Sequence, residues 1–91
     1  MKSRNEFYVD LDRLVAYRAR LEERRKVLTK LYVQYDRDLE EAHRRWDDEI
    51  YVATRATATK TAEHIKALLG KLAQAIRAID EKIKRIKDYL R

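Results

Sequence analysis

Apolar residues recur along most of the chain at alternating steps of three and four residues, the spacing of one face of an α-helix. In the first half they form two seven-residue series, with Val15, Val27 and Leu31 widening the stripe. One series is Leu14, Leu21, Leu28, Tyr35 and Ala42, and the other is Leu11, Arg18, Arg25, Tyr32, Leu39 and Trp46. This pattern predicts an amphipathic helix over residues 10–46, about 35 residues and about 50 Å long.

The expected start of this helix is Asp10, because aspartate is a favoured N-cap and its charge suits the helix dipole. Val9 is then placed to pack on Leu14 as a hydrophobic staple. Residues 1–9 show no helical periodicity and are predicted to form an extended lead-in.

The second half carries a more regular apolar stripe, which predicts a helix over residues 50–90. One series is Leu69, Ile76, Ile83 and Leu90, and the other is Ile65, Leu72, Ile79 and Ile86. Two such series over nearly four heptads indicate coiled-coil-like packing against another helix.

The segment Trp46, Asp47, Asp48 decides how the two helices are arranged. It contains no glycine or proline, so one uninterrupted helix of about 80 residues is an alternative. However, aspartate favours caps and turns, and the two stripes do not share a heptad register. We therefore expect a turn at 47–49 and an antiparallel hairpin, in which residue i faces residue ~94−i.

Composition agrees with an all-α fold in a single domain of residues 1–91. The chain has no proline, one glycine, and 42% charged residues. It has no cysteine and only two histidines, so disulfides and a metal site are not available to strengthen a small core. Association is the remaining way to bury more surface. We expect the hairpin to form a four-helix bundle, as a homodimer or as a heterodimer with another helical hairpin.

The net charge of +6 is divided evenly between the halves of the chain. Residues 1–45 contain 12 basic and 9 acidic residues, and residues 46–91 contain 10 and 7. Interleaved charges are typical of a solvated helix surface, and the basic balance mildly favours an acidic partner. Acidic residues precede both basic clusters, so nucleic acid is not the expected partner, although a nucleic-acid-associated protein or a structural subunit of a larger assembly stays as an alternative.

No segment predicts a membrane span or a secretory leader, which places the protein in the cytoplasm when it is made. Catalysis is not expected, because no nucleophile elbow, phosphate-binding loop or zinc-binding motif occurs. His43 should face residues near 51, far from His64, so no metal site is predicted. No cofactor is expected either.

The residues predicted to contact a partner are those of the two stripes. They are Leu14, Arg18, Leu21, Arg25, Leu28, Tyr32, Tyr35, Leu39, Ile65, Leu69, Leu72 and Ile76. The two arginines interrupt an apolar series, which leaves two explanations. Either they extend past the edge of the stripe into solvent, or they pair with acidic residues of the partner and select it.

This layout resembles the WXG-motif, early-secreted-antigen-like family of type VII secretion substrates. Phe7, Tyr8, Val9 and Asp10 followed by Leu14 resemble the family's entry into its first helix, and Trp46 stands where the family has its motif tryptophan. Ile50, Ala62, Ile65, Leu68, Leu69 and Leu72 resemble its second-helix core. The resemblance implies a helical partner and leaderless export, as a substrate or as its small partner or chaperone.

Two departures affect that resemblance. Asp48 replaces the glycine of the motif, so the turn does not follow from the family pattern. The family's export signal after the second helix, tyrosine followed four residues later by an acidic residue, is also missing. Only Leu90 and Arg91 follow Tyr89. The resemblance therefore implies export together with a partner that carries the signal, or a member that has left secretion.

Overall fold

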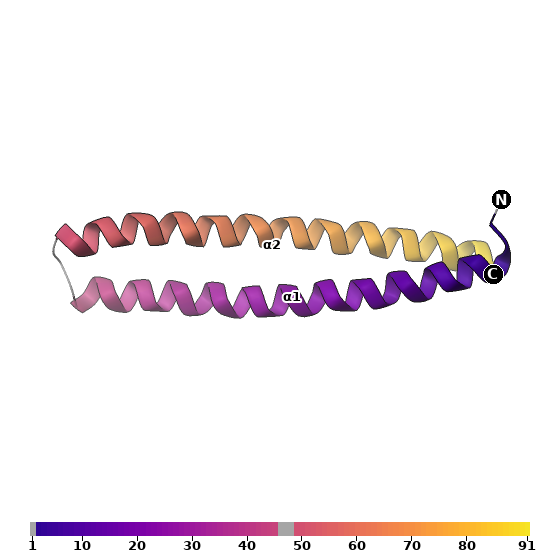
Figure 1. Ribbon diagram of the computed structural model, residues 1–91, viewed down its shortest axis with the longest axis horizontal. Coiled ribbons are helices and arrows are strands. Elements are labelled where there is room, and N and C mark those ends of the chain that lie inside the picture. The colour runs from indigo at the N-terminus through magenta and orange to yellow at the C-terminus, as the bar shows by residue number, and fades with distance from the viewer. Residues whose placement is uncertain (1, 46–48) are drawn as a thin grey trace. The chain divides into compact units, whose positions relative to one another are not determined.

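Two α-helices make up the fold. The computed structural model describes residues 2–45 and 49–91, and in this part of the chain it contains no strand. Helix α1 spans Arg4–Arg45 and helix α2 spans Glu49–Leu90 (Figure 1). The helices contact each other, so the predicted all-α helical hairpin is confirmed. The predicted turn residues Trp46, Asp47 and Asp48 lie outside the described residues.

Helix α1 begins six residues earlier than predicted, so an extended lead-in and an N-cap at Asp10 are both wrong. The cap is Ser3, whose Oγ accepts a hydrogen bond from the Glu6 backbone N–H at 3.2 Å, while its carbonyl accepts one from the Phe7 N–H at 3.2 Å. These bonds satisfy N–H groups that a helix start leaves without a partner. Val9 is helical and exposed, so the predicted staple is also wrong.

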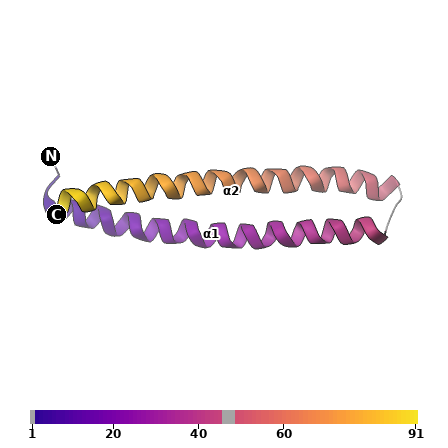
Figure 2. The same cartoon turned by 180° about the vertical axis from the view of Figure 1, so that it is seen from behind.

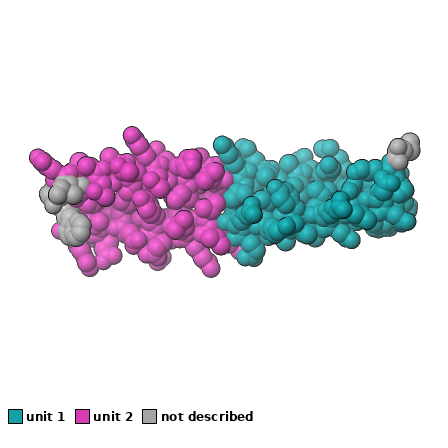
Figure 3. Space-filling view, viewed as in Figure 1, with its two compact units in different colours: residues 1–25, 71–91 teal, residues 26–70 magenta. Residues whose placement is uncertain are grey.

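The described residues form two compact units, each of which contains part of both helices (Figure 3). Unit 1 comprises Met1–Arg25 and Lys71–Arg91, and unit 2 comprises Lys26–Gly70. Each unit therefore combines segments that are far apart in the sequence, as an antiparallel helix pair requires.

In unit 1 the start of α1 lies beside the end of α2, as both ribbon views show (Figures 1 and 2). The Arg4 guanidinium donates from Nη2 to the Leu90 carbonyl oxygen at 2.5 Å. The rings of Phe7 and Tyr89 are in contact, with centroids 4.6 Å apart and planes tilted by 45°. These contacts show that the two helix segments are antiparallel.

In unit 2 the end of α1 is paired in the same way with the start of α2. The Tyr51 hydroxyl donates to the Leu39 carbonyl oxygen at 3.2 Å, and the Tyr51 ring stacks on His43 with centroids 5.9 Å apart. The prediction that His43 faces residues near 51 is therefore confirmed.

The core is the seam between the helices. Its buried residues are Leu21, Tyr51, Ala58, Ile65, Ile76, Ile83, Ile86 and Leu90. Six of the eight belong to the predicted apolar series. Tyr51 and Ala58 were missed, although they continue the Ile65 series upstream at seven-residue steps. None of the large side chains among the described residues is completely buried, which is what a seam of only two helices allows.

Candidate protein-interaction surfaces

The twelve residues predicted to contact a partner lie within the hairpin seam. Leu21, Ile65 and Ile76 are buried, and the other nine are half-buried. Their apolar surface holds α1 and α2 together, so only their outer edges are accessible to another protein. Contact of these residues with a partner stays a prediction.

Arg18 pairs with an acidic residue of its own chain. Its guanidinium donates to the Asp80 carboxylate from Nε at 2.5 Å and from Nη2 at 3.3 Å. This hydrogen bond, together with the charge of Asp80, raises the pKa of Arg18. The arginine therefore bridges the two helices of unit 1, where the sequence suggested either free extension into solvent or a partner's acid.

Arg25 is held within α1. Its Nη2 and Nε donate to one carboxylate oxygen of Glu22, at 2.5 and 3.1 Å, and this hydrogen bond raises the pKa of Arg25. Residues three apart on a helix are neighbours, so this pair costs little conformational freedom. Both arginines that interrupt the stripe have acidic partners in their own chain.

Three large apolar side chains of unit 2 remain outside the seam. Val27 is 63% exposed, Leu31 51% and Leu68 37%. Leu31 follows the seam residue Leu28 by three positions, and Leu68 follows Ile65 by three. Equivalent positions on two antiparallel helices lie on the same flank of the pair. Val27 lies one turn before Leu31, so these side chains belong to one flank, here named the valine–leucine patch.

This patch differs from the sequence expectation. The family resemblance implied that Leu68 belongs to the second-helix core, and Val27 and Leu31 were expected to widen the first-helix stripe. All three are exposed because the two-helix seam is narrow and uses only two positions of each heptad.

The other flank of unit 2 carries a shallow depression of about 250 Å³ near the stacked His43 and Tyr51 rings. Its lining residues are Asp36, Leu39, Glu40, His43, Arg55 and Thr59. His43 and His64 are both exposed, and no group of three metal-ligating side chains occurs within residues 2–45 and 49–91. The depression therefore offers mixed charge at the surface without an enclosed binding site.

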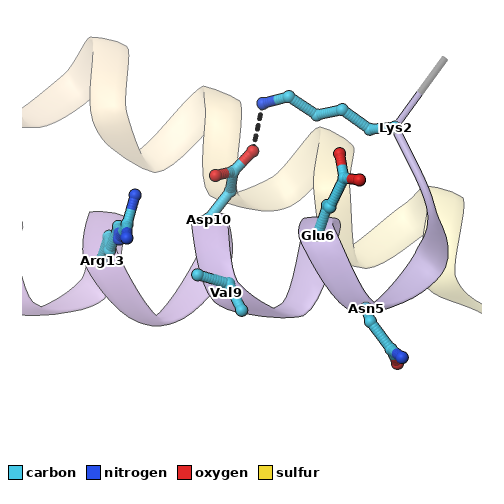
Figure 4. Close-up of a pocket in the computed structure, with 6 residues that line it drawn as sticks. All are labelled: Lys2, Asn5, Glu6, Val9, Asp10 and Arg13. Carbon is cyan, nitrogen blue, oxygen red and sulfur yellow. Dashed lines mark hydrogen bonds and ion pairs between the residues drawn. The ribbon is translucent and has the colours of Figure 1, made fainter.

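A second depression, of about 290 Å³, lies at the start of α1 in unit 1 (Figure 4). Lys2 crosses it and forms an ion pair with Asp10, and Glu6, Val9 and Arg13 complete most of its wall. The hydrogen bond from Lys2 is the largest of the effects that lower the pKa of Asp10. The ion pair satisfies the principal charges here, so the depression closes on its own residues.

Comparisons with known proteins return no matching family model, curated protein or solved structure. The resemblance to the WXG-motif family therefore stays a prediction. Among the described residues, neither helix is long and apolar enough to cross a membrane.

Proposed function

We propose that this chain is a protein-interaction module in which the hairpin packs against a second helical hairpin through the valine–leucine patch. The single observation that carries the proposal is that Val27, Leu31 and Leu68 remain exposed on one flank of unit 2. Clustered apolar side chains on a surface are typical of sites where another protein docks.

The thin core supports association. The seam buries one side of each helix, and a chain of 91 residues buries a smaller share of its surface than a larger domain does. Packing two hairpins side by side would cover the patch and give each helix a second neighbour. The product is a four-helix arrangement, in which each hairpin supplies two helices.

A second copy of the chain is the partner that the charges of unit 2 favour. Residues 26–70 contain 8 basic and 8 acidic residues. This balance means that two copies can bring the same surface together without net repulsion, as an isologous dimer requires. The resemblance to type VII secretion substrates supports the same kind of interaction with a different hairpin, and it implies export of the pair without a leader.

The test is the mass of the purified chain in solution, measured by sedimentation equilibrium from about 1 to about 100 µM. We expect a dimer that dissociates on dilution. Leu31→Glu should shift the protein toward monomer while its helical circular dichroism is kept, because a charge would then face the apolar surface of the other copy.

Val52→Glu is the matched control. Val52 is also an exposed valine of unit 2, but it lies outside the patch and next to the seam residue Tyr51. It should leave the dissociation constant nearly unchanged. A chain that is folded and monomeric throughout this range, both alone and co-expressed with neighbouring gene products, would overturn the proposal. Equal effects of Leu31→Glu and Val52→Glu would remove the patch from it.

A further inference from the structure

The fold collects the net positive charge in one unit. Unit 1 contains 14 lysines and arginines against 8 aspartates and glutamates, whereas unit 2 contains 8 of each. The excess of +6 therefore belongs entirely to residues 1–25 and 71–91. Dividing the sequence at Trp46 hides this, because each half of the chain contributes one basic segment to unit 1.

The basic side chains of unit 1 are not spread evenly around the helix pair. Asp10 on α1 and Lys82 on α2 lie on the same flank. Hydrogen bonding to Lys2 is the largest of the effects that lower the Asp10 pKa, and the charges of Arg13 and Lys82 contribute to it as well. The contact between Phe7 and Tyr89 lies on this flank too.

The same short pattern occurs on both helices of this flank. Arg13 is followed four residues later by Tyr17, and Arg85 is followed four residues later by Tyr89. Residues four apart lie one above the other on a helix, so each tyrosine has an arginine beside it. Arg20 and Lys82 extend these rows. The six residues, Arg13, Tyr17, Arg20, Lys82, Arg85 and Tyr89, are named the basic–tyrosine face.

All six side chains of the face are exposed, and the tyrosine rings are accessible. Tyr17 is 48% exposed and Tyr89 is 60% exposed. The Tyr89 ring is nevertheless fixed on one side by its contact with Phe7. A ring that is both held and exposed loses little freedom when a planar group stacks on it.

Carboxylates near the face leave its charge largely intact. Asp10 is already bonded to Lys2, and Glu81 pairs with Arg85 only loosely, at 3.8 Å with both side chains well exposed. The two closer pairs of the unit, Arg18 with Asp80 and Arg25 with Glu22, lie at seam positions and toward the opposite flank. One flank is thus mixed in charge and the other is predominantly basic.

We propose that the basic–tyrosine face binds single-stranded nucleic acid, with phosphates on its arginine and lysine side chains and bases stacked on Tyr17 and Tyr89. Cations beside exposed aromatic rings are the combination that single strands require, since every base has a stacking surface and every nucleotide has a charge. An anionic membrane would call for bulky apolar side chains on the face, and it has none. An acidic protein has no need of two exposed rings.

Fluorescence anisotropy of a labelled 20-nucleotide oligothymidylate tests this with the full-length chain. If about four phosphates are contacted, affinity should fall roughly 50-fold between about 50 and about 200 mM salt. Arg20→Gln combined with Lys82→Gln should weaken binding at least about tenfold and flatten the salt dependence. Tyr17→Ala combined with Tyr89→Ala should weaken it at least about fivefold with the salt dependence unchanged.

The matched control is Arg77→Gln combined with Lys84→Gln. It removes the same charge from exposed positions of unit 1 that lie off the face. We expect less than about a threefold effect, because only long-range attraction changes. Equal weakening by the two charge pairs would overturn the proposal in favour of net charge alone. No binding at low salt, or binding only to phosphatidylserine vesicles, would overturn it as well. The dimer test on Leu31 is independent of these outcomes.

Discussion

Arg18 on α1 and Asp80 on α2 form a two-point hydrogen-bonded ion pair between the helices of unit 1, with Nε at 2.5 Å from one carboxylate oxygen. Arg18 stands in the middle of an otherwise apolar series. Its side chain reaches one turn beyond the residue that simple antiparallel pairing places opposite it. A pair with this geometry favours one register of the helices, because sliding either helix by a turn separates the charges.

Replacing either member of this pair should have opposite effects. Asp80→Asn should lower the Tm slightly, and the difference should vanish in about 1 M NaCl, because both side chains are substantially exposed and salt screens their attraction. Arg18→Leu should raise the Tm, because leucine continues the apolar series and leaves only an exposed carboxylate behind. Thermal unfolding followed by circular dichroism measures both. A lower Tm for Arg18→Leu would mean that the pair contributes more than apolar packing does.

The cap at Ser3 gives a second prediction. Ser3→Ala should destabilise the start of α1 by about 0.5–1 kcal/mol, because the Glu6 N–H loses its side-chain acceptor. Hydrogen exchange of the Glu6 amide should accelerate, while amides in the middle of α1 should be unaffected. Ser3→Asp keeps an acceptor and is the control. If Asp10→Ala opened the first helical turns and Ser3→Ala did not, the helix would begin where the sequence first suggested.

The seam could be predicted from sequence because its period is a local property. Leu21, Ile65 and Ile76 were assigned to it from spacing alone, and all three are buried. The start of α1 could not be fixed in the same way, since Ser3 and Asp10 are both acceptable caps. Phe7, which continues the Leu14 series upstream, was the signal that favoured Ser3.

Surface features depended on chain reversal and could not be predicted from either half of the sequence. The acid that faces Arg18 is set by helix register and by the reach of the arginine side chain, so Asp80 was not identified. The exposure of Leu68 follows from the seam being only two helices wide. The basic–tyrosine face combines residues from α1 and α2, and only the antiparallel pairing brings their patterns together.

Acid should selectively weaken the ion pair of Asp10. Its pKa is lowered from the ordinary value of 3.8, first by the hydrogen bond from Lys2 and then by neighbouring positive charges. The ionised carboxylate therefore stabilises the fold above about pH 4, and this contribution is lost as the pH falls through the lower folded-state pKa. Asp10→Asn should be less stable than the parent at pH 7, and the two should converge at acid pH.

Asp12→Asn is the control for this acid dependence, because it removes a nearby exposed carboxylate without touching the pair with Lys2. Urea unfolding at a series of pH values provides the comparison. A gap between the parent and Asp10→Asn that stays constant down to pH 2 would show that the effect of the substitution is not electrostatic.

Gly70 should be replaceable with a gain in stability. It lies inside α2, its φ is not positive, and a Cβ placed there meets no atom within 4 Å. Gly70→Ala should therefore add about 1 kcal/mol and raise the Tm by about 4–8 °C. Ala67→Gly, at an exposed position in the same helix, should have the opposite effect. If Gly70→Ala lowered stability only at concentrations where the protein is associated, a second chain would approach α2 closely at this position.

Tyr51 offers the sharpest test of unit 2, because it combines a buried ring, a stacked neighbour and a hydrogen bond. Its hydroxyl donates to the Leu39 carbonyl at 3.2 Å, and its ring stacks on His43. Tyr51→Phe keeps the ring and should cost about 0.5–1.5 kcal/mol in urea unfolding. Tyr51→Ala should cost about 3–5 kcal/mol, because it also leaves a cavity in the seam. Tyr17→Phe removes a hydroxyl from an exposed ring and should be neutral. If Tyr51→Phe were equally neutral, the hydroxyl would contribute nothing, and the pairing of α1 with α2 in unit 2 would rest on ring packing alone.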